Sequence, residues 1–280
     1  MNIHDVLNRY RLTSFTEKEK GTRFEKLMKQ WLLTDPRFND FAKVWLWEEF
    51  PGRKDFGGSD LGIDLVAKTD TGEYCAIQCK CYQASATIDK PIVDSFIATS
   101  GKSFVDEDTY QTVTFSRRLW ISTTNHWGTN AEETIHNQTP PVNRIGLRDL
   151  EDSPVDWQKL QAGIEGKAAL LEGKQLRKHQ LEAISKARDY YADHDRGKLI
   201  MACGTGKTFT ALRMAEDLLD GHGLVLFMVP SISLLGQSLN AWMADAKTPI
   251  KAICICSDNK AQRSTNDSDE TLSSVVDLAL

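Results

Sequence analysis

The sequence predicts an α/β fold divided into two domains, and three observations support this prediction. At 280 residues the chain is longer than one average domain. Residues 1–150 mix helical and strand patterns, whereas residues 174–280 alternate strands and helices around a glycine-rich loop. Hydrophobic residues make up 41% of the chain, which is enough to bury sizeable cores. We therefore expect one domain over 1–150, a linker over 151–173 and an incomplete second domain over 174–280.

The first half predicts three helices and four strands. An amphipathic helix over 17–33 ends before Pro36, because the residue that precedes a proline disfavours helical angles. Two further helices are expected, one over 90–99 and one that a capping box of Thr129 and Glu132 opens. Strand patterns cover 44–50, 62–67, 74–81 and 119–123. A turn over 69–72 connects the second of these strands to the third.

The second half changes to a regular alternation. A helix over 178–192 comes first, and a second helix over 208–219 follows the glycine-rich loop. Strand patterns cover 198–202, 224–229 and 250–256. This order is typical of a parallel sheet with crossover helices.

Composition and charge exclude several classes of protein. The net charge of −5 argues against a polybasic protein that coats DNA by charge alone, although it leaves room for a local DNA-binding patch. No apolar run reaches the roughly 18 to 20 residues of a membrane span, and the first residues lack the pattern of a signal peptide. We expect a soluble, cytoplasmic protein with no membrane partner. Its six cysteines include no CxxC pair, and Cys75, Cys79 and Cys81 lack the spacing of a zinc site.

The segment MACGTGKT over 201–208 is the strongest local signal. A phosphate-binding loop needs backbone N–H groups that converge on an anion, and glycines permit that turn. It also needs a lysine that reaches the phosphates and a hydroxyl that holds Mg²⁺. Met201 is a departure, because a glycine usually stands there. The residues expected to bind ATP, with Thr208 as a metal ligand, are Gly204, Thr205, Gly206, Lys207 and Thr208.

This loop resembles motif I of superfamily 2 helicases and translocases. The segment LRKHQLEAI over 176–184 is similar to the Q motif of that family, which implies that Gln180 recognises adenine. A solvent-facing helix residue is the alternative interpretation of Gln180. The segment VPSISLLGQ over 229–237 resembles motif Ia, which implies contact with a nucleic-acid backbone. No DExH-type motif follows a strand, since the acidic run at 267–270 lies in a polar stretch, so we expect ATP hydrolysis only in a longer parent protein.

A second group of polar residues lies on two neighbouring strands of the first half. Gln78 and Lys80 share one face of a strand, and a hairpin with the preceding strand brings Asp64 beside them. A carboxylate, a second oxygen ligand and a lysine suit metal-assisted phosphodiester hydrolysis. The alternative is that Gln78 and Lys80 form the solvated face of an edge strand. Asp60 is expected to be a turn residue.

This group resembles the Mrr-like branch of the PD-(D/E)xK nucleases, in which glutamine replaces the second acidic residue. The resemblance implies a restriction-endonuclease fold, with a mixed sheet flanked by helices, metal binding by Asp64 and Gln78, and catalysis by Lys80. The branch also carries a glutamate in an early G-x-x-F-E helix, which implies a site role for Glu25. The alternative for Glu25 is a surface ion pair with Lys29 one turn later.

Such a nuclease placed directly before a superfamily 2 motor resembles the N-terminal part of single-chain Type ISP restriction–modification enzymes. The resemblance implies cleavage of double-stranded DNA with Mg²⁺, ATP-driven translocation in the parent protein, and helicase, methyltransferase and target-recognition domains downstream. Two alternatives remain. One is the motor subunit of a multi-subunit Type I enzyme, and the other is a non-cleaving DNA-binding or sensing module with a degenerate nuclease fold. Plausible phosphate contacts are Lys90, Lys102, Arg117 and Arg118.

Overall fold

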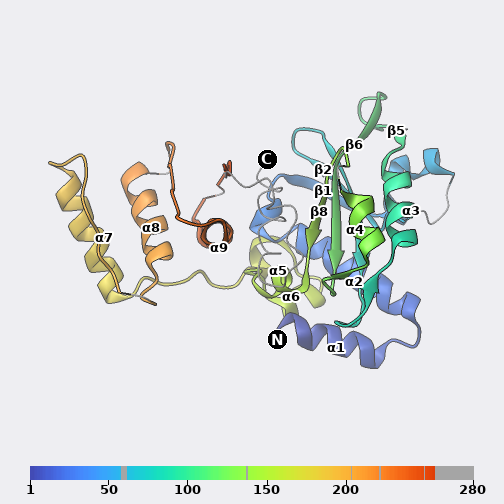
Figure 1. Ribbon diagram of the computed structural model, residues 1–280, viewed down its shortest axis with the longest axis horizontal. Coiled ribbons are helices and arrows are strands. Elements are labelled where there is room, and N and C mark those ends of the chain that lie inside the picture. The colour runs from blue at the N-terminus through green and yellow to red at the C-terminus, as the bar shows by residue number, and fades with distance from the viewer. Residues whose placement is uncertain (58–61, 137, 203, 221, 249, 256–280) are drawn as a thin grey trace. The chain divides into compact units, whose positions relative to one another are not determined.

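The computed structural model describes residues 1–57, 62–136, 138–202, 204–220, 222–248 and 250–255 (Figure 1). The expected turn at Asp60 and the acidic run at 267–270 lie outside the described residues. The chain divides into two compact units, Met1–Leu171 and Glu172–Leu280. Nowhere in the described residues does a helix combine the length and apolar character needed to cross a membrane.

Two helices open the first unit. Helix α1 (Ile3–Thr13) begins with a capping box in which Asn2 and Asp5 exchange hydrogen bonds of 3.0 and 2.9 Å, a signal that the sequence-based prediction overlooked. Helix α2 (Glu17–Leu32) confirms the helix expected there. It begins at Thr16, whose hydroxyl accepts the Glu19 N–H, and it buries one apolar face. That face consists of Phe24, Leu27, Met28, Trp31 and Leu32.

A mixed sheet forms the centre of this unit, as expected. Strands β1 (Phe41–Leu46), β2 (Leu65–Thr69) and β3 (Tyr74–Lys80) are antiparallel neighbours. Strand β6 (Thr112–Ser122) then pairs parallel with β3, and β8 (Val142–Ile145) pairs parallel with β6. The short strand β5 (Ser103–Val105) pairs antiparallel with the start of β6.

Strand β3 lies between β2 and β6, and six of its seven residues are buried. Tyr74 and Ala76 face a core cluster that also contains Phe96 and Trp120. The alternate residues, including Ile77, are buried on the opposite face, where α2 packs against β1 and β3. The edge-strand interpretation of this segment is therefore wrong.

Helices α3 (Lys90–Ser100) and α4 (Thr129–Ile135) pack against each other beside the strands of this unit (Figure 1). Strands β4 (Thr87–Ile88) and β7 (His126–Trp127) form a two-stranded parallel pair. Strand β4 precedes α3 in the chain, and β7 precedes α4. The expected capping box of α4 is wrong. Gly128 is the N-cap, and Glu132 pairs with Arg144 instead.

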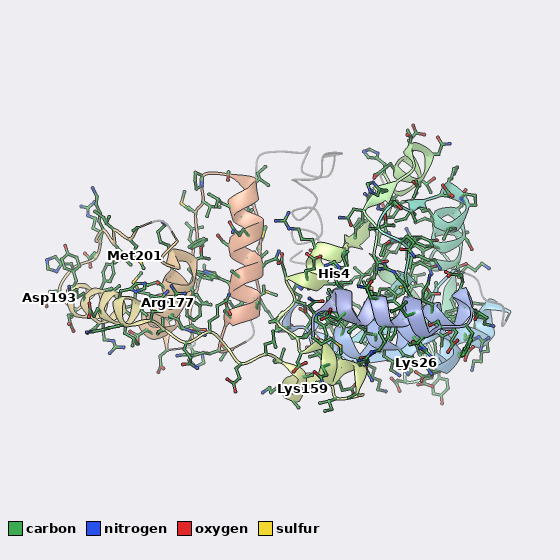
Figure 2. All side chains as sticks on the ribbon, turned by 90° about the horizontal axis from the view of Figure 1, so that it is seen from below. His4, Lys26, Lys159, Arg177, Asp193 and Met201 are labelled. Carbon is green, nitrogen blue, oxygen red and sulfur yellow. The ribbon has the colours of Figure 1, made fainter. Side chains whose placement is uncertain are left out.

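The segment between the two expected domains folds with the first unit. Helices α5 (Leu147–Glu151) and α6 (Trp157–Gln161) are short, and Trp157 and Leu160 are buried. Helix α6 contacts α1 and α2, and Arg9 of α1 donates a 3.0 Å hydrogen bond to Gln161. A side-chain contact also joins α1 to α5, because Nε2 of His4, which is labelled in Figure 2, lies 2.5 Å from a carboxylate oxygen of Glu151. The functional division at 150 and 173 stays a prediction.

The strand expected over 44–50 ends four residues early. Residues Trp47–Glu49 and Pro51–Phe56 form 3₁₀ turns. These turns direct Trp47, Phe50 and Phe56 into one aromatic cluster with Phe104, whose ring centroid lies 5.1 Å from that of Phe50. Burial of several aromatic side chains from one short segment outweighs continuation of the β ladder.

The second unit contains helices α7 (Lys178–Tyr191), α8 (Lys207–Leu219) and α9 (Ile232–Asp245). Helix α8 contacts both α7 and α9. The expected strands differ from the structure, because the described residues of 198–202, 224–229 and 250–256 have no regular secondary structure. A parallel strand needs neighbours on which to form its ladder, and these segments have none within the described residues. Their apolar side chains are correspondingly exposed, as with Ile200 and Leu224 at 90% and 94%.

Candidate functional site

Asp64 directly precedes β2, and hydrogen bonds of its backbone fix its position. Its N–H donates to Ile77 O of β3 at 2.9 Å, and its C=O accepts the Trp47 N–H at 2.8 Å. Gly62, two residues earlier, has a φ of +87°, and a Cβ at that position would lie 2.9 Å from Ser95 Oγ. The turn therefore requires glycine and fixes where the Asp64 side chain leaves the sheet.

Gln78 and Lys80 meet Asp64 at the end of β3. Gln78 Nε2 donates a hydrogen bond to Asp64 Oδ2, and the Cys79 N–H donates to the same oxygen at 2.7 Å. Lys80 Nζ lies 3.8 Å from Asp64 Oδ2, and the Lys80 side chain is 25% exposed. The structure thus brings together the three residues that the sequence placed in one site.

The Gln78 side chain is completely buried, and its Oε1 has no hydrogen-bond partner within the described residues. A buried acceptor without a partner destabilises the fold, so a cation or a hydrogen-bond donor bound at this oxygen would be stabilising. Oxygen donors of carboxylate and amide groups suit Mg²⁺, and Asp64 and Gln78 supply one of each. No cluster of three or more His, Cys, Asp or Glu side chains with metal-binding geometry occurs in the part of the chain that the structure describes. Because the donors of Asp64 and Gln78 are oxygen atoms, they fit a hard cation better than zinc.

Glu25 reaches this region from the other side of the sheet. It follows the buried Phe24 on α2, and its charge acts on the thiol of Cys79, as do the charges of Asp64 and Lys80. Burial and the two carboxylates raise the pKa of the Cys79 thiol well above its usual value, whereas Lys80 lowers it. Lys29, the alternative partner of Glu25, donates a 2.6 Å hydrogen bond to Glu49.

The proposed phosphate contacts differ in their surroundings. Arg118 is only 4% exposed and donates to Pro140 O, so its assignment as a surface phosphate contact is wrong. Arg117 pairs with Asp40 at 2.6 Å, and Lys90 pairs with Asp94 at 2.7 Å. Lys102 is exposed just after α3.

The glycine-rich loop of the second unit lies directly before α8, in the sequence that follows Met201, which Figure 2 labels. Gly204 and Gly206 have φ angles of +75° and +81°, which glycine adopts readily. The Thr205 hydroxyl and the Lys207 ammonium both donate to Ala202 O, at 2.7 and 3.3 Å. Thr208 lies in the first turn of α8, and its carbonyl accepts the indole N–H of Trp242 of α9.

Gln180 connects α7 to this loop. Its Nε2 donates to Thr205 O at 3.2 Å and to Gly206 O at 3.3 Å, and its Oε1 accepts the Arg177 N–H. The side chain is 4% exposed, so the solvent-facing interpretation is wrong. His179 Nε2 also lies 3.2 Å from Thr205 O, a contact that the sequence did not predict.

Two family models match successive parts of the chain. Residues 33–167 match the family model of an Mrr-type restriction endonuclease, and residues 173–278 match that of the type III restriction enzyme, res subunit. The chain joins a restriction-endonuclease domain to a helicase-like domain. A search of curated proteins returned no match.

A solved structure similar to this chain is the ATP-dependent Type ISP restriction–modification enzyme LlaBIII bound to DNA. The two share 31% sequence identity with a TM-score of 0.68. The alignment covers 90% of this chain and 15% of LlaBIII, so the chain spans a small part of the length of that enzyme. The resemblance to the N-terminal part of Type ISP enzymes is therefore confirmed.

Proposed function

We propose that the restriction-endonuclease domain cuts double-stranded DNA with Mg²⁺, as part of a restriction–modification system. The observation that carries this proposal is the convergence of Asp64, Gln78 and Lys80, with a buried Gln78 oxygen that has no hydrogen-bond partner within the described residues. The DNA substrate is supported by the family match and by the similarity to LlaBIII, whose structure contains the enzyme bound to DNA.

Each residue has a distinct role in this proposal. Asp64 and the Gln78 amide oxygen would hold the metal, which when bound would neutralise charge and lower the pKa of water. Lys80, partly exposed, orients the attacking water and stabilises the charge that develops on the phosphate oxygens. Glu25 adds a second carboxylate to the field of the site from α2.

The helicase-like domain is proposed to bind ATP. The backbone of Gly204, Thr205 and Gly206 would surround the phosphates, Lys207 would leave Ala202 O to contact them, and Thr208 would hold Mg²⁺. Gln180, which binds the loop carbonyls, would couple adenine recognition to the loop. Hydrolysis and DNA translocation are assigned to the longer parent protein, together with helicase, methyltransferase and target-recognition domains. We propose that the protein is located in the cytoplasm.

The deciding experiment is plasmid cleavage in Mg²⁺ by the whole enzyme and by two variants. Asp64→Ala and Lys80→Ala should remove nicking and linearisation while ATP hydrolysis persists, because the two sites lie in different units. Cleavage that continues in both variants would refute the site. Retained DNA binding with no cleavage by the wild-type enzyme would instead favour the non-cleaving module.

A further inference from the structure

The corner between α1 and α2 carries two apolar side chains that the fold does not use. Leu12 is 86% exposed and Phe15 is 96% exposed, although α1 buries its other apolar residues fully. Phe15 directly precedes the N-cap Thr16, a position from which an apolar residue often packs onto the fourth residue of the helix. That residue is Lys20, so no such packing partner exists for Phe15 here.

The corner is nevertheless held in one conformation. The Phe15 N–H donates to a carboxylate oxygen of Glu19 at 2.9 Å, and the Ser14 N–H donates to Tyr10 O at 3.0 Å. The Arg23 guanidinium donates to the Thr13 hydroxyl at 2.8 Å. An exposed phenyl ring on a fixed turn loses little conformational entropy when it enters a partner, which favours binding.

The charge around this corner is opposite to that of the whole chain. Residues 9–23 hold five cationic side chains against two carboxylates, whereas the complete sequence has a net charge of −5. Glu17 and Glu19 each pair with a cation of α2, Lys20 and Arg23. Three cations remain that pair with no carboxylate of the described residues, and these are Arg9, Arg11 and Lys18. An excess of cations around an apolar tip suits a polyanion that also offers apolar surfaces.

The corner also lies at the catalytic end of the sheet. Arg11 donates a 3.1 Å hydrogen bond to Tyr82 O, two residues beyond Lys80. The same carbonyl accepts the Thr123 hydroxyl, and the Thr123 N–H donates to Lys80 O at 3.0 Å. Hydrogen bonds therefore connect Arg11 at the corner, through Tyr82 and Thr123, to the backbone of Lys80 at the end of β3.

We propose that Phe15, supported by Leu12, is an apolar wedge that enters a base step of the DNA duplex beside the scissile phosphate. This proposal rests on the proposed nuclease function and adds a DNA-distorting contact from α1–α2, which lies outside the residues matched to the restriction-endonuclease family. Insertion of an apolar side chain unstacks a step and bends the duplex. The bend brings the backbone toward Lys80, while Arg9, Arg11 and Lys18 contact the adjacent phosphates.

The test uses the full 280-residue chain with duplexes that carry 2-aminopurine at successive positions, in Ca²⁺ so that binding proceeds without cleavage. Because target recognition is assigned to the longer parent protein, the wild-type chain should raise the 2-aminopurine fluorescence across the set of duplexes rather than at one fixed position. Phe15→Ala should lose this rise and bind about 10-fold more weakly, whereas Phe15→Trp should keep both properties. Tyr110→Asn is the matched control, because Tyr110 is 83% exposed on a turn with positive φ that asparagine tolerates.

The outcomes separate this proposal from the proposed function. Lys80→Ala should keep the fluorescence rise while it loses cleavage in Mg²⁺. If Phe15→Ala matches the wild type in fluorescence and affinity, the wedge is refuted while the nuclease function stands. That result would favour a protein, rather than DNA, as the partner of the corner. If the wild type shows the rise and never cleaves, the nuclease function fails and the wedge stands. Absence of any DNA binding by the wild type would refute both.

Discussion

Lys80 Nζ lies 3.8 Å from Asp64 Oδ2, although 15 residues and a turn separate the two in the sequence. The β2–β3 hairpin produces this proximity. Because Leu65 pairs with Ile77, Asp64 before β2 lies at the same end of the hairpin as the last residues of β3. The distance is longer than a hydrogen bond, which leaves the ammonium able to contact a water or a phosphate oxygen.

We predict that Lys80→Arg cleaves DNA at least about 100-fold more slowly than wild type, because a planar guanidinium cannot replace a compact ammonium at a partly buried position. The measurement is single-turnover plasmid cleavage. Lys102→Arg, at an exposed position, is the matched control and should cleave normally. Equal rates for the two variants would remove Lys80 from the site.

Gln78→Glu should couple stability to metal. The substitution puts a second carboxylate next to Asp64 in a fully buried position, so repulsion should lower the melting temperature in EDTA. A divalent cation then binds the native state more tightly and should raise the melting temperature by more than in the wild type. Thermal unfolding with and without Mg²⁺ measures this difference. An identical Mg²⁺ response in both proteins would contradict metal binding at Gln78.

Asp35 should make the first unit acid-sensitive. Burial alone would raise the pKa of this carboxyl, but the charge and hydrogen bonds of Arg37, with Ser153, lower it below its usual value. A carboxyl whose pKa is depressed in the folded state stabilises the fold above its unfolded pKa near 3.8, and this contribution is lost as pH falls through the folded value.

Asp35→Asn should therefore cost about 3–5 kcal/mol at pH 7, because it removes the closer carboxylate partner of the buried Arg37 guanidinium and leaves only the longer contact of 3.9 Å with Asp149. The variant should also lose less stability than the wild type as the pH falls below 3.8. Urea unfolding across this range is the measurement. Asp94→Asn, in a pair whose side chains are 48% and 47% exposed, is the control and should change stability by less than about 1 kcal/mol.

Gly206→Ala should damage the nucleotide loop more than Gly204→Ala. Both glycines have positive φ angles, so each substitution carries a similar backbone strain of about 1–2 kcal/mol. A Cβ at Gly206 would also lie 2.6 Å from Gln180 Nε2, whereas a Cβ at Gly204 meets nothing within 4 Å. ATP affinity, measured with a fluorescent analogue, should fall further for Gly206→Ala. The Gln180→Ala/Gly206→Ala double variant should differ from additivity, and strict additivity would argue against the contact.

Much of the candidate site of the first unit could be predicted because its signals are local. The alternation of Gln78 and Lys80 and the short turn before them fix which side chains share a face. The burial of Gln78 could not be predicted in this way, because it depends on the parallel pairing of Gln78 with Trp120 of β6, and alternation within one strand does not show which distant strand lies beside it. The expected metal and ATP ligands remain predictions, since geometry alone places them together.

The errors have specific physical causes. Helix α1 is absent from the expected elements although Ile3, Val6, Leu7 and Tyr10 have helical spacing and Asn2 and Asp5 form a capping box. The strand over 44–50 was extended too far because aromatic residues favour strands as well as clusters. In the second unit, apolar runs such as that at Leu224 predict strands, but a strand forms only where a neighbour completes its ladder.

The parallel pairing of β3 with β6 has a consequence for the order of events on the ribosome. Lys80 pairs with Ser122, which is synthesised 42 residues later, and α6 follows later still. The β2–β3 hairpin can close as soon as it emerges, but its site-bearing end becomes buried only after β6 arrives and a long loop closes. A nascent chain therefore passes through a stage in which Asp64, Gln78 and Lys80 are present but solvated. The candidate site would reach its folded geometry only once nearly the whole first unit has been translated.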